Sequence, residues 1–181
     1  MSIDRRTAIR NFLMISAGVV FIPSCLQEKG KASIVLKNID VDADDEKLLA
    51  EVCETFIPKT DTPGAKDISA HLFVLKMLDD CTAKADQQKI LKGLRGIDKM
   101  ADKKFNTSFV KCTPEQRQEL FKSIESKQGT SDDVDQFYKS VKKLTIQAYT
   151  TSKYYLTNVH IYELVPARFH GCVPVGTTNT L

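Results

Sequence analysis

Apolar side chains recur every three or four residues in five segments of this chain, the spacing of a helix that buries one face. In the first segment, Leu48, Val52 and Phe56 follow a cluster of aspartates that can cap a helix, and the series ends before a proline. The expected helices span about residues 42–56, 67–82, 85–105, 113–128 and 131–148. Strand-like alternation is nearly absent from these segments. We therefore predict an all-α fold, a compact bundle of about five helices.

Local signals mark two helix starts and one weak point. Residues 113–116 (Thr-Pro-Glu-Gln) follow the order of a capping box with proline at the first helical position. Ser131 stands before two aspartates, as a helix N-cap commonly does. Gly93 and Gly96 lower the helix propensity of the third segment. We expect these two glycines to permit close packing or a kink.

The first 25 residues have the three parts of an export leader. The basic stretch contains the pair Arg5 and Arg6 and resembles the twin-arginine export motif. The apolar run 12–22 has eleven residues, about half of what a helix needs to cross a bilayer. Ile-Pro-Ser-Cys at 22–25 resembles a lipobox, although an uncleaved or differently cleaved leader is the alternative. We predict a twin-arginine, lipoprotein-type signal, lipidation at Cys25 and a membrane-anchored periplasmic protein.

The segments on either side of the helices look different from them. Residues 26–43 are predicted to be a short tether, within which 34–41 alternates loosely and is expected to be extended. Residues 152–181 are rich in aromatic residues, contain glycines and prolines, and show no helical stripe. We predict an irregular C-terminal tail that packs either on its own bundle or on a partner. The helical domain is assigned to residues 44–181.

The charge balance argues against a nucleic-acid partner. The chain has 181 residues, of which 42% are hydrophobic and 27% charged, with a formal net charge of +3. The first 25 residues hold three arginines and one aspartate, so the remainder has 23 basic and 22 acidic residues. A nearly neutral body lacks the concentrated basic face that phosphate binding requires. Its lysines are read as solvated helix faces.

Polar side chains that could carry chemistry do not form the pattern of a site. His71 lies on a mostly apolar helix face, where a core or interface role is the commoner one. His160 and His170 have no acidic residue at the spacing of metal ligands. Asp79 and Asp80 are adjacent, so on a helix they point about 100° apart. Glycine-rich phosphate loops and nucleophile elbows are missing from the sequence, and we predict no catalytic, cofactor-binding or metal-binding residue on this chain.

The cysteines follow no metal or redox pattern either. None of the five forms a CxxC pair, which leaves zinc ribbons, thioredoxin-like chemistry and c-type haem attachment without support. With Cys25 lipidated, four cysteines remain, and these allow three disulfide pairings. Cys53 lies on an apolar helix face, so we expect a small buried hydrophobe there.

The connection between the first two helices is the most distinctive loop of the chain. It reads Ile-Pro-Lys-Thr-Asp-Thr-Pro-Gly-Ala over residues 57–65. Two prolines stiffen it, and Pro63-Gly64 matches the central pair of a type II turn. Taken alone, these residues favour a rigid helix connector.

Several blocks of the sequence together resemble a known family. They are the 57–65 loop, Leu49-Ala50-Glu51, His71-Leu72-Phe73, Met77-Leu78 and the tail segment from Tyr162 to Pro174. Over roughly residues 45–175 the chain resembles the small subunit called gluconate 2-dehydrogenase subunit 3. The twin-arginine leader belongs to the same pattern.

The resemblance implies a non-catalytic role within an oxidoreductase complex. Such subunits pair with a large flavoprotein of the glucose-methanol-choline (GMC) class that holds FAD and oxidises a sugar or sugar acid, and a cytochrome c subunit often accepts the electrons. The small subunit carries no cofactor and aids folding, export or stability of the large one. The residues expected to bind the partner are Pro58, Thr60, Asp61, Thr62, Pro63, Gly64, Ala65, His71, Tyr162 and Phe169.

Three points stay open at this level. Cys172 is a candidate for an intersubunit disulfide, with a partner inside the chain as the alternative. A stand-alone envelope lipoprotein that binds a ligand or serves as a scaffold is the competing function. An independent enzyme is the third reading.

Overall fold

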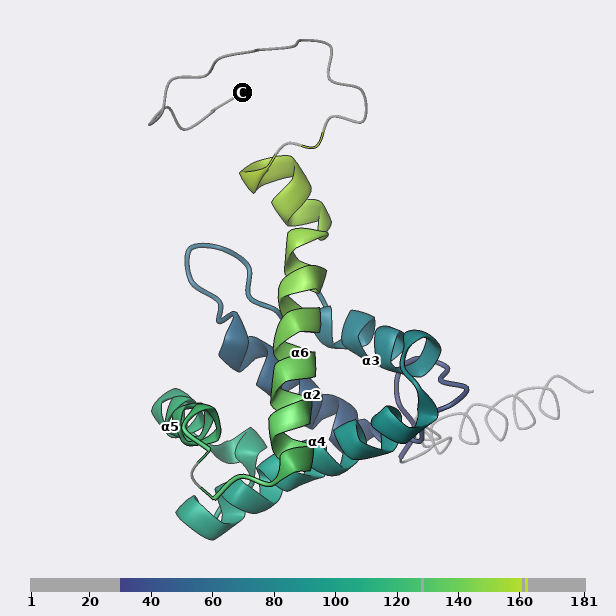
Figure 1. Ribbon diagram of the computed structural model, residues 1–181. Coiled ribbons are helices and arrows are strands. Elements are labelled where there is room, and N and C mark those ends of the chain that lie inside the picture. Colours follow the sequence, from purple (N-terminus) through teal and green to yellow (C-terminus); the bar gives the residue numbers. More distant parts are fainter. Residues whose placement is uncertain (1–29, 128, 161, 163–181) are drawn as a thin grey trace, which may run out of the picture. The chain divides into compact units, whose positions relative to one another are not determined.

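The computed structural model describes residues 30–127, 129–160 and 162, and their regular structure is entirely helical (Figure 1). Ala32–Leu181 forms one compact unit, described here, and Met1–Lys31 forms another. The elements are α2 (Ala43–Phe56), α3 (Ala70–Cys81), α4 (Lys84–Phe105), η1 (Phe109–Lys111), α5 (Pro114–Glu125), α6 (Asp132–Thr150) and η2 (Tyr155–Val159). The all-α fold with five helices is confirmed. None of the described helices is both long and apolar enough to cross a membrane.

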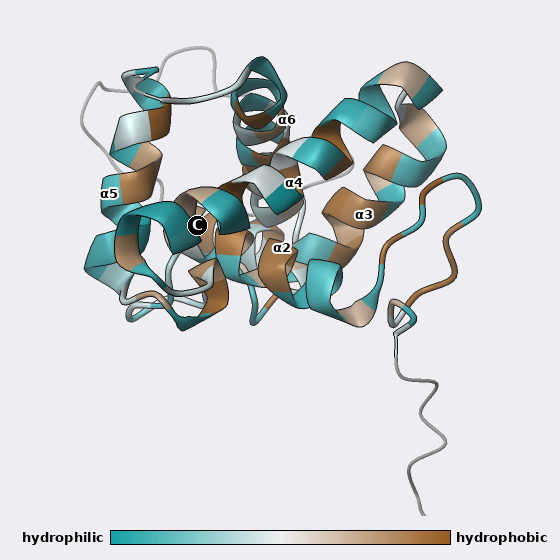
Figure 2. Ribbon diagram, turned by 90° about the horizontal axis from the view of Figure 1, so that it is seen from below, coloured by the Kyte–Doolittle hydropathy of each residue, from teal (hydrophilic) through white to brown (hydrophobic). Residues whose placement is uncertain are grey.

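Helices α4 and α6 cross at very close range (Figures 1 and 2). A Cβ atom at Gly93 would lie 2.3 Å from the backbone oxygen of Asp133 and 2.4 Å from Cβ of Phe137. At Gly96 it would lie 2.6 Å from Cγ2 of Val134. The close packing expected at these two glycines is confirmed, because a Cβ atom at either position would lie closer than 3.0 Å to an atom of α6.

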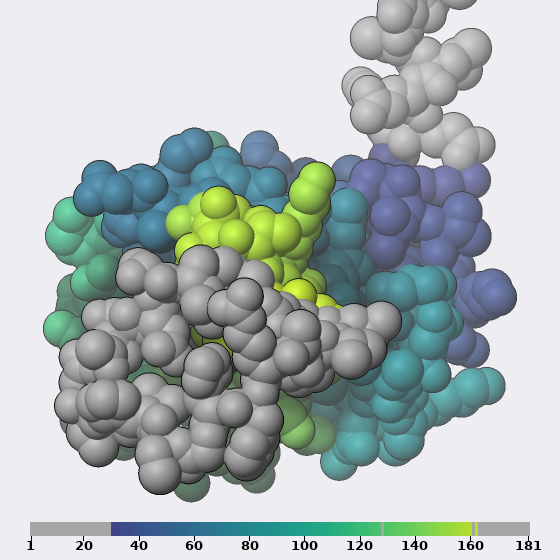
Figure 3. Space-filling view, turned by 90° about the horizontal axis from the view of Figure 1, so that it is seen from above, coloured from purple at the N-terminus to yellow at the C-terminus, as the bar shows by residue number. Residues whose placement is uncertain are grey.

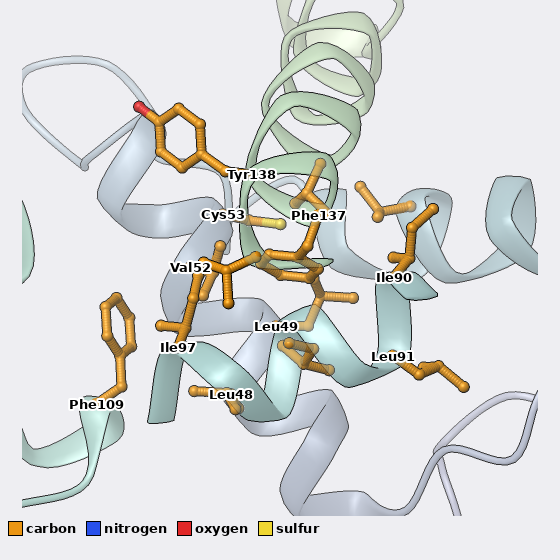
Figure 4. Packing of buried hydrophobic residues seen from close by; sticks show 14 of the residues in the cluster. Leu48, Leu49, Val52, Cys53, Ile90, Leu91, Ile97, Phe109, Phe137 and Tyr138 are labelled. Carbon is orange, nitrogen blue, oxygen red and sulfur yellow. The ribbon is translucent and has the colours of Figure 1, made fainter. Parts of the chain in front are cut away.

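The core lies where α2, α4 and α6 meet. Figure 4 shows Phe137 pointing from α6 toward Val52 and Cys53 of α2. Thr145 of α6 is fully buried and donates its hydroxyl to Cys53 Sγ at 3.3 Å. Burial raises the pKa of the Cys53 thiol to about 12, so this side chain is the small buried hydrophobe that the sequence predicts.

The helix starts follow the sequence signals, with one exception. Asp42 caps α2, Thr113 and Gln116 form the expected capping box of α5, and Ser131 caps α6. Helix α3, however, begins at Ala70 rather than near Asp67. The carboxylate of Asp67 accepts a hydrogen bond from the backbone of the preceding loop instead of capping a helix, so the chain turns for three more residues.

Residues 32–41, which fall within the predicted tether, pack onto the helices, and we call them the strap. Residues 32, 34 and 36 are half-buried while their neighbours are exposed, but the backbone bends at 33–34 and again at 37–38, so the single extended segment expected over 34–41 does not form. Ile39 and Val41 are buried in the core. The strap is therefore part of the domain rather than a free spacer, because apolar side chains and backbone groups both find partners there.

Asp79 of α3 fastens the strap. Lys37, Asn38 and Ile39 donate their backbone N–H groups to its carboxylate at 2.9, 2.6 and 3.1 Å. The side chain is 1% exposed. Burial raises the pKa of this carboxyl, but the three N–H donors outweigh burial and hold the pKa below its usual range. Asp79 thus has a structural role inside the domain. Asp80, by contrast, lies at the surface and pairs with Lys76.

The first part of the predicted irregular tail is helical, which corrects that expectation. Tyr155–Val159 forms one π-helical turn, η2, after α6 has ended at Thr150. Ser152 starts this turn, since its hydroxyl accepts from the backbone N–H of Tyr155 at 3.2 Å. A turn that begins with a local side-chain hydrogen bond does not need a stripe of apolar residues, so the hydrophobic pattern did not predict it.

Candidate functional site

A carboxylate from α2 holds both ends of the loop that leads to α3. We call residues 57–67 the connecting loop. Glu54 accepts the backbone N–H of Lys59 at 2.9 Å with one oxygen and that of Lys66 at 2.8 Å with the other. Hydrogen bonds from backbone groups to a charged acceptor are among the stronger ones in proteins. Glu54 therefore closes the loop into a defined ring.

A second carboxylate, Asp67, closes the same loop from its far end. It accepts the backbone N–H of Gly64 at 3.1 Å and pairs with the ammonium of Lys59 at 3.2 Å. These two donors, Gly64 first, lower the pKa of Asp67. A Cβ atom at Gly64 would lie 2.5 Å from Oε1 of Glu54, so the ring has room only for glycine at this position.

An ion-pair network ties the connecting loop to the next layer of helices. Glu51 accepts from Lys66 of the loop and, at 2.6 Å, from Arg117 of α5. Burial raises the pKa of Glu51, but these two cations outweigh it and the pKa falls below its usual range. Arg117 also donates to the backbone oxygens of Phe109 and Val110 at 3.2 and 2.7 Å. The loop thus rests on a network that is partly shielded from solvent.

The tip of the connecting loop points into solvent. Its exposed residues are Pro58, Lys59, Thr60, Asp61 and Thr62. The backbone N–H of Thr60 donates to the Thr62 oxygen at 3.0 Å, and the two hydroxyls lie 3.3 Å apart. Asp61 makes no hydrogen bond or ion pair with the described residues. The backbone of the tip is therefore held in place, while the carboxylate of Asp61 stays available to a partner.

The end of α6 lies beside this loop, as the view from above also shows (Figure 3). The hydroxyl of Tyr149 donates to the backbone oxygen of Pro63 at 3.0 Å. Its ring contacts Tyr154 and Tyr155 edge-on, each at 6.3 Å between centroids. A groove of about 430 Å³ runs between the start of α3 and this end of α6, with Ile68, Phe73, Ala148 and Tyr154 among its lining residues. Segments distant in sequence thus form one continuous surface.

Exposed apolar side chains occur on α6, on η2 and just after it. Of the four large hydrophobic side chains exposed in the described part of the chain, three are here: Ile146, Val159 and Tyr162, at 47%, 56% and 62%. We call residues 58–62 together with 146–160 and Tyr162 the apical surface. A polar tip beside exposed apolar side chains is typical of a protein-binding surface.

The structure divides the predicted partner-binding residues into three groups. Pro58, Thr60, Asp61, Thr62 and Tyr162 are exposed on the apical surface, whereas Gly64 and Ala65 are buried behind the tip and Pro63 is half-buried. Phe169 lies outside the described residues, as do Arg5, Arg6, Cys25 and Cys172. For every residue that the sequence predicts to bind the partner, this contact stays a prediction.

His71 lies apart from the loop tip, half-buried on α3. Its Nε2 is 3.8 Å from Oε1 of Glu46, and its Nδ1 is buried without a hydrogen-bond partner among the described residues. Burial lowers the pKa of the imidazole, which Glu46 offsets only in part. His71 therefore packs inside the domain as a neutral side chain near neutral pH.

Sequence reasoning missed the residues that shape the loop, namely Glu51, Glu54, Arg117 and Tyr149. One signal was available for Glu54. It stands in the last turn of α2, which contains no basic residue, although helix C-termini disfavour negative charge. An acid placed there indicates another donor nearby, here the loop amides.

Other parts of the described chain offer little for catalysis or metal binding. No group of three or more His, Cys, Asp or Glu side chains among the described residues is placed to hold a metal ion. Cys53, Cys81 and Cys112 are free thiols. A cleft of about 540 Å³ beside α2 and α4 has Arg95 and Asp45 among its lining residues, and these two form an ion pair at 2.6 Å.

Comparison with known proteins supports one assignment. The sequence profile described as Gluconate 2-dehydrogenase subunit 3 matches residues 43–167, which include all five helices and the connecting loop. No curated protein and no solved structure matches the chain significantly. The profile covers well over half of the sequence, and it names a small subunit of a dehydrogenase complex. The chain belongs to the gluconate 2-dehydrogenase subunit 3 family.

Proposed function

We propose that this chain is a non-catalytic small subunit that binds a large, FAD-dependent GMC-type dehydrogenase through its apical surface and aids its folding, export and stability. The family assignment supports a place in a multi-subunit dehydrogenase complex, and the FAD-dependent GMC class of the large subunit is part of the proposal. The observation that carries the proposal is the connecting loop, whose backbone Glu54 and Asp67 hold from behind while its tip faces solvent. FAD and the sugar or sugar-acid substrate belong to the partner.

Rigidity of the loop favours binding because little order has to be created when the complex forms. Fixing a mobile loop on association costs free energy, and a preformed loop avoids most of this cost. Exposed Ile146, Val159 and Tyr162 supply apolar area around the tip. Asp61 has no partner within the described residues, so we expect a basic side chain of the large subunit to lie opposite it.

The leader completes the proposed role. Arg5 and Arg6 direct the folded chain to the twin-arginine pathway, which the large subunit uses as a passenger. A lipid on Cys25 then holds the complex at the periplasmic side of a membrane, where a cytochrome c subunit receives the electrons. We further propose that Cys172 forms a disulfide with the large subunit. Non-reducing electrophoresis tests this, since a large subunit that migrates alone excludes it.

Co-purification with a charge reversal tests the docking proposal. Full-length chain carrying a short tag after Leu181 is recovered from its native cells, and the absorption spectrum of the co-purifying protein is recorded. We expect an equimolar flavoprotein with the wild type and about tenfold less with Asp61→Lys, because like charges then face each other. Asp102→Lys is the matched control, an exposed aspartate on α4.

Two results would contradict the proposal. Recovery of the wild type without a flavoprotein favours the stand-alone lipoprotein. Equal loss of partner in both variants shows that net charge rather than the apical surface matters. Circular dichroism confirms that both variants fold.

A further inference from the structure

The strap fixes the path of the chain from its first residues onward. Ser33 donates its backbone N–H and its hydroxyl to the Glu46 carboxylate, both at 2.6 Å. Further along, Asp79 holds three consecutive backbone N–H groups of the strap. Nothing after Ser33 is therefore free to act as a spacer.

Few residues separate Cys25 from the strap in the sequence. Only residues 26–31 stand between Cys25 and Ala32, which allows at most about 25 Å of fully extended chain. The inference below rests on the lipid at Cys25 that forms part of the proposed function. With that anchor, the strap is the folded segment closest along the chain to the bilayer.

The chemistry of the strap fits a lipid surface. Val35 is 83% exposed, more than any other large hydrophobic side chain of the described residues. It lies between Ile34 and Leu36, which are half-buried against the core, and Lys31 and Lys37 stand on either side of these three residues in sequence. Figure 2 shows hydrophobic colour along the strap, which lies at the edge of the domain next to α3. Apolar side chains bordered by lysines are typical of segments that enter the headgroup layer.

We infer that the strap around Val35 is a membrane-contact surface, which rests in the phospholipid headgroups and sets the orientation of the domain. Glu46, which holds the strap, stands in the first turns of α2, and the connecting loop follows the last turn of the same helix. Fourteen helical residues span about 20 Å. The bilayer and the large subunit therefore meet opposite ends of α2 and do not compete for surface.

The chain contains no tryptophan, so a single introduced one reports its own surroundings. Lipidated full-length V35W is reconstituted into phosphatidylethanolamine–phosphatidylglycerol vesicles whose acyl chains are brominated, and its fluorescence is compared with that in unbrominated vesicles. We expect about twofold quenching, because interfacial segments insert by only about 5–10 Å. K122W is the control, an exposed position on α5, which lies across the domain from the strap (Figures 1 and 2). It should stay unquenched.

Flotation separates the possible failures. Protein that floats with the vesicles but is quenched equally in both variants, or in neither, overturns the inference and leaves the anchor intact. Protein that does not float lacks the lipid, which overturns the anchor and the inference together.

Because tryptophan itself favours the interface, the wild type is tested as well. Amide hydrogen exchange at residues 34–36 should be at least severalfold slower for the lipidated protein on vesicles than for protein that carries no lipid and is measured without detergent. Unchanged exchange also overturns the inference.

Discussion

Replacing Gly93 with alanine puts a methyl group where α6 already lies. The new Cβ atom would be 2.3 Å from the Asp133 backbone oxygen and 2.4 Å from Cβ of Phe137, whereas real Cβ contacts stay above 3.0 Å. Neither atom belongs to a flexible side-chain end. Relief therefore requires α6 to move away from α4, which loosens the core between them.

The magnitude follows from two opposing contributions. Forcing an extra carbon into a packed core costs about 1–3 kcal/mol, and backbone clashes lie at the upper end of that range. Alanine regains about 1 kcal/mol over glycine in helix propensity. The expected net loss is about 2 kcal/mol of unfolding free energy, or about 4–8 °C in Tm for a domain of this size.

Urea denaturation and calorimetry of Gly93→Ala measure this loss, and Gly96→Ala is the matched control. At Gly96 the Cβ would meet a single side-chain atom, Cγ2 of Val134, at 2.6 Å. We expect the control to stay within about 1 kcal/mol of wild type, because helix propensity offsets the milder contact. A Gly93→Ala protein as stable as the wild type would refute the reasoning about α4 and α6.

Three further predictions concern the strap, the loop and the thiols. Asp79→Asn should lower stability by about 2 kcal/mol and speed exchange of the backbone N–H groups it holds. The N–H donors hold the folded-state pKa of Asp79 below its unfolded-state pKa of about 3.9. The stability that Asp79 contributes is therefore complete above about pH 3.9 and is lost as the pH falls through the folded-state pKa. The difference in urea midpoint between wild type and Asp79→Asn should be constant from about pH 7 to 5 and should vanish in acid. Gly64→Ala should reduce flavoprotein recovery severalfold, because its Cβ would lie 2.5 Å from the Glu54 carboxylate and 2.7 Å from the Lys59 backbone nitrogen, and recovery equal to wild type would count against a preformed loop. With a thiol reagent under native conditions, peptide mapping should find Cys81 modified within minutes and Cys53 only after unfolding, since Cys53 is buried and its pKa is about 12.

The helices could be predicted because their signals are local. The spacing of apolar residues, the capping residues and the helix-breaking residues predicted that all five helices exist, and the two glycines of the third correctly indicated close packing. The start of α3 could not be placed, since Asp67 satisfies a loop amide rather than a helix end. The strap was interpreted as a spacer because Asp79, which accepts its backbone hydrogen bonds, lies about forty residues further along the sequence.

The candidate site shows the same division. The loop stood out by its prolines and glycine, and resemblance to the family gave it a role. Its shape depends on Glu54 and Glu51, which accept from Lys59 and Lys66 of the loop, and Arg117 pairs with Glu51 once α5 has packed against α2. No periodicity or motif encodes such contacts.

The construction of the connecting loop separates two kinds of constraint on sequence change. Glu54 and Asp67 set the backbone path from behind, so Gly64 cannot vary without disturbing this chain. The side chains of Thr60 and Thr62 bond only within the tip, and Asp61 makes no hydrogen bond or ion pair with the described residues. A substitution at one of these three positions should therefore change partner recognition while every helix keeps its packing.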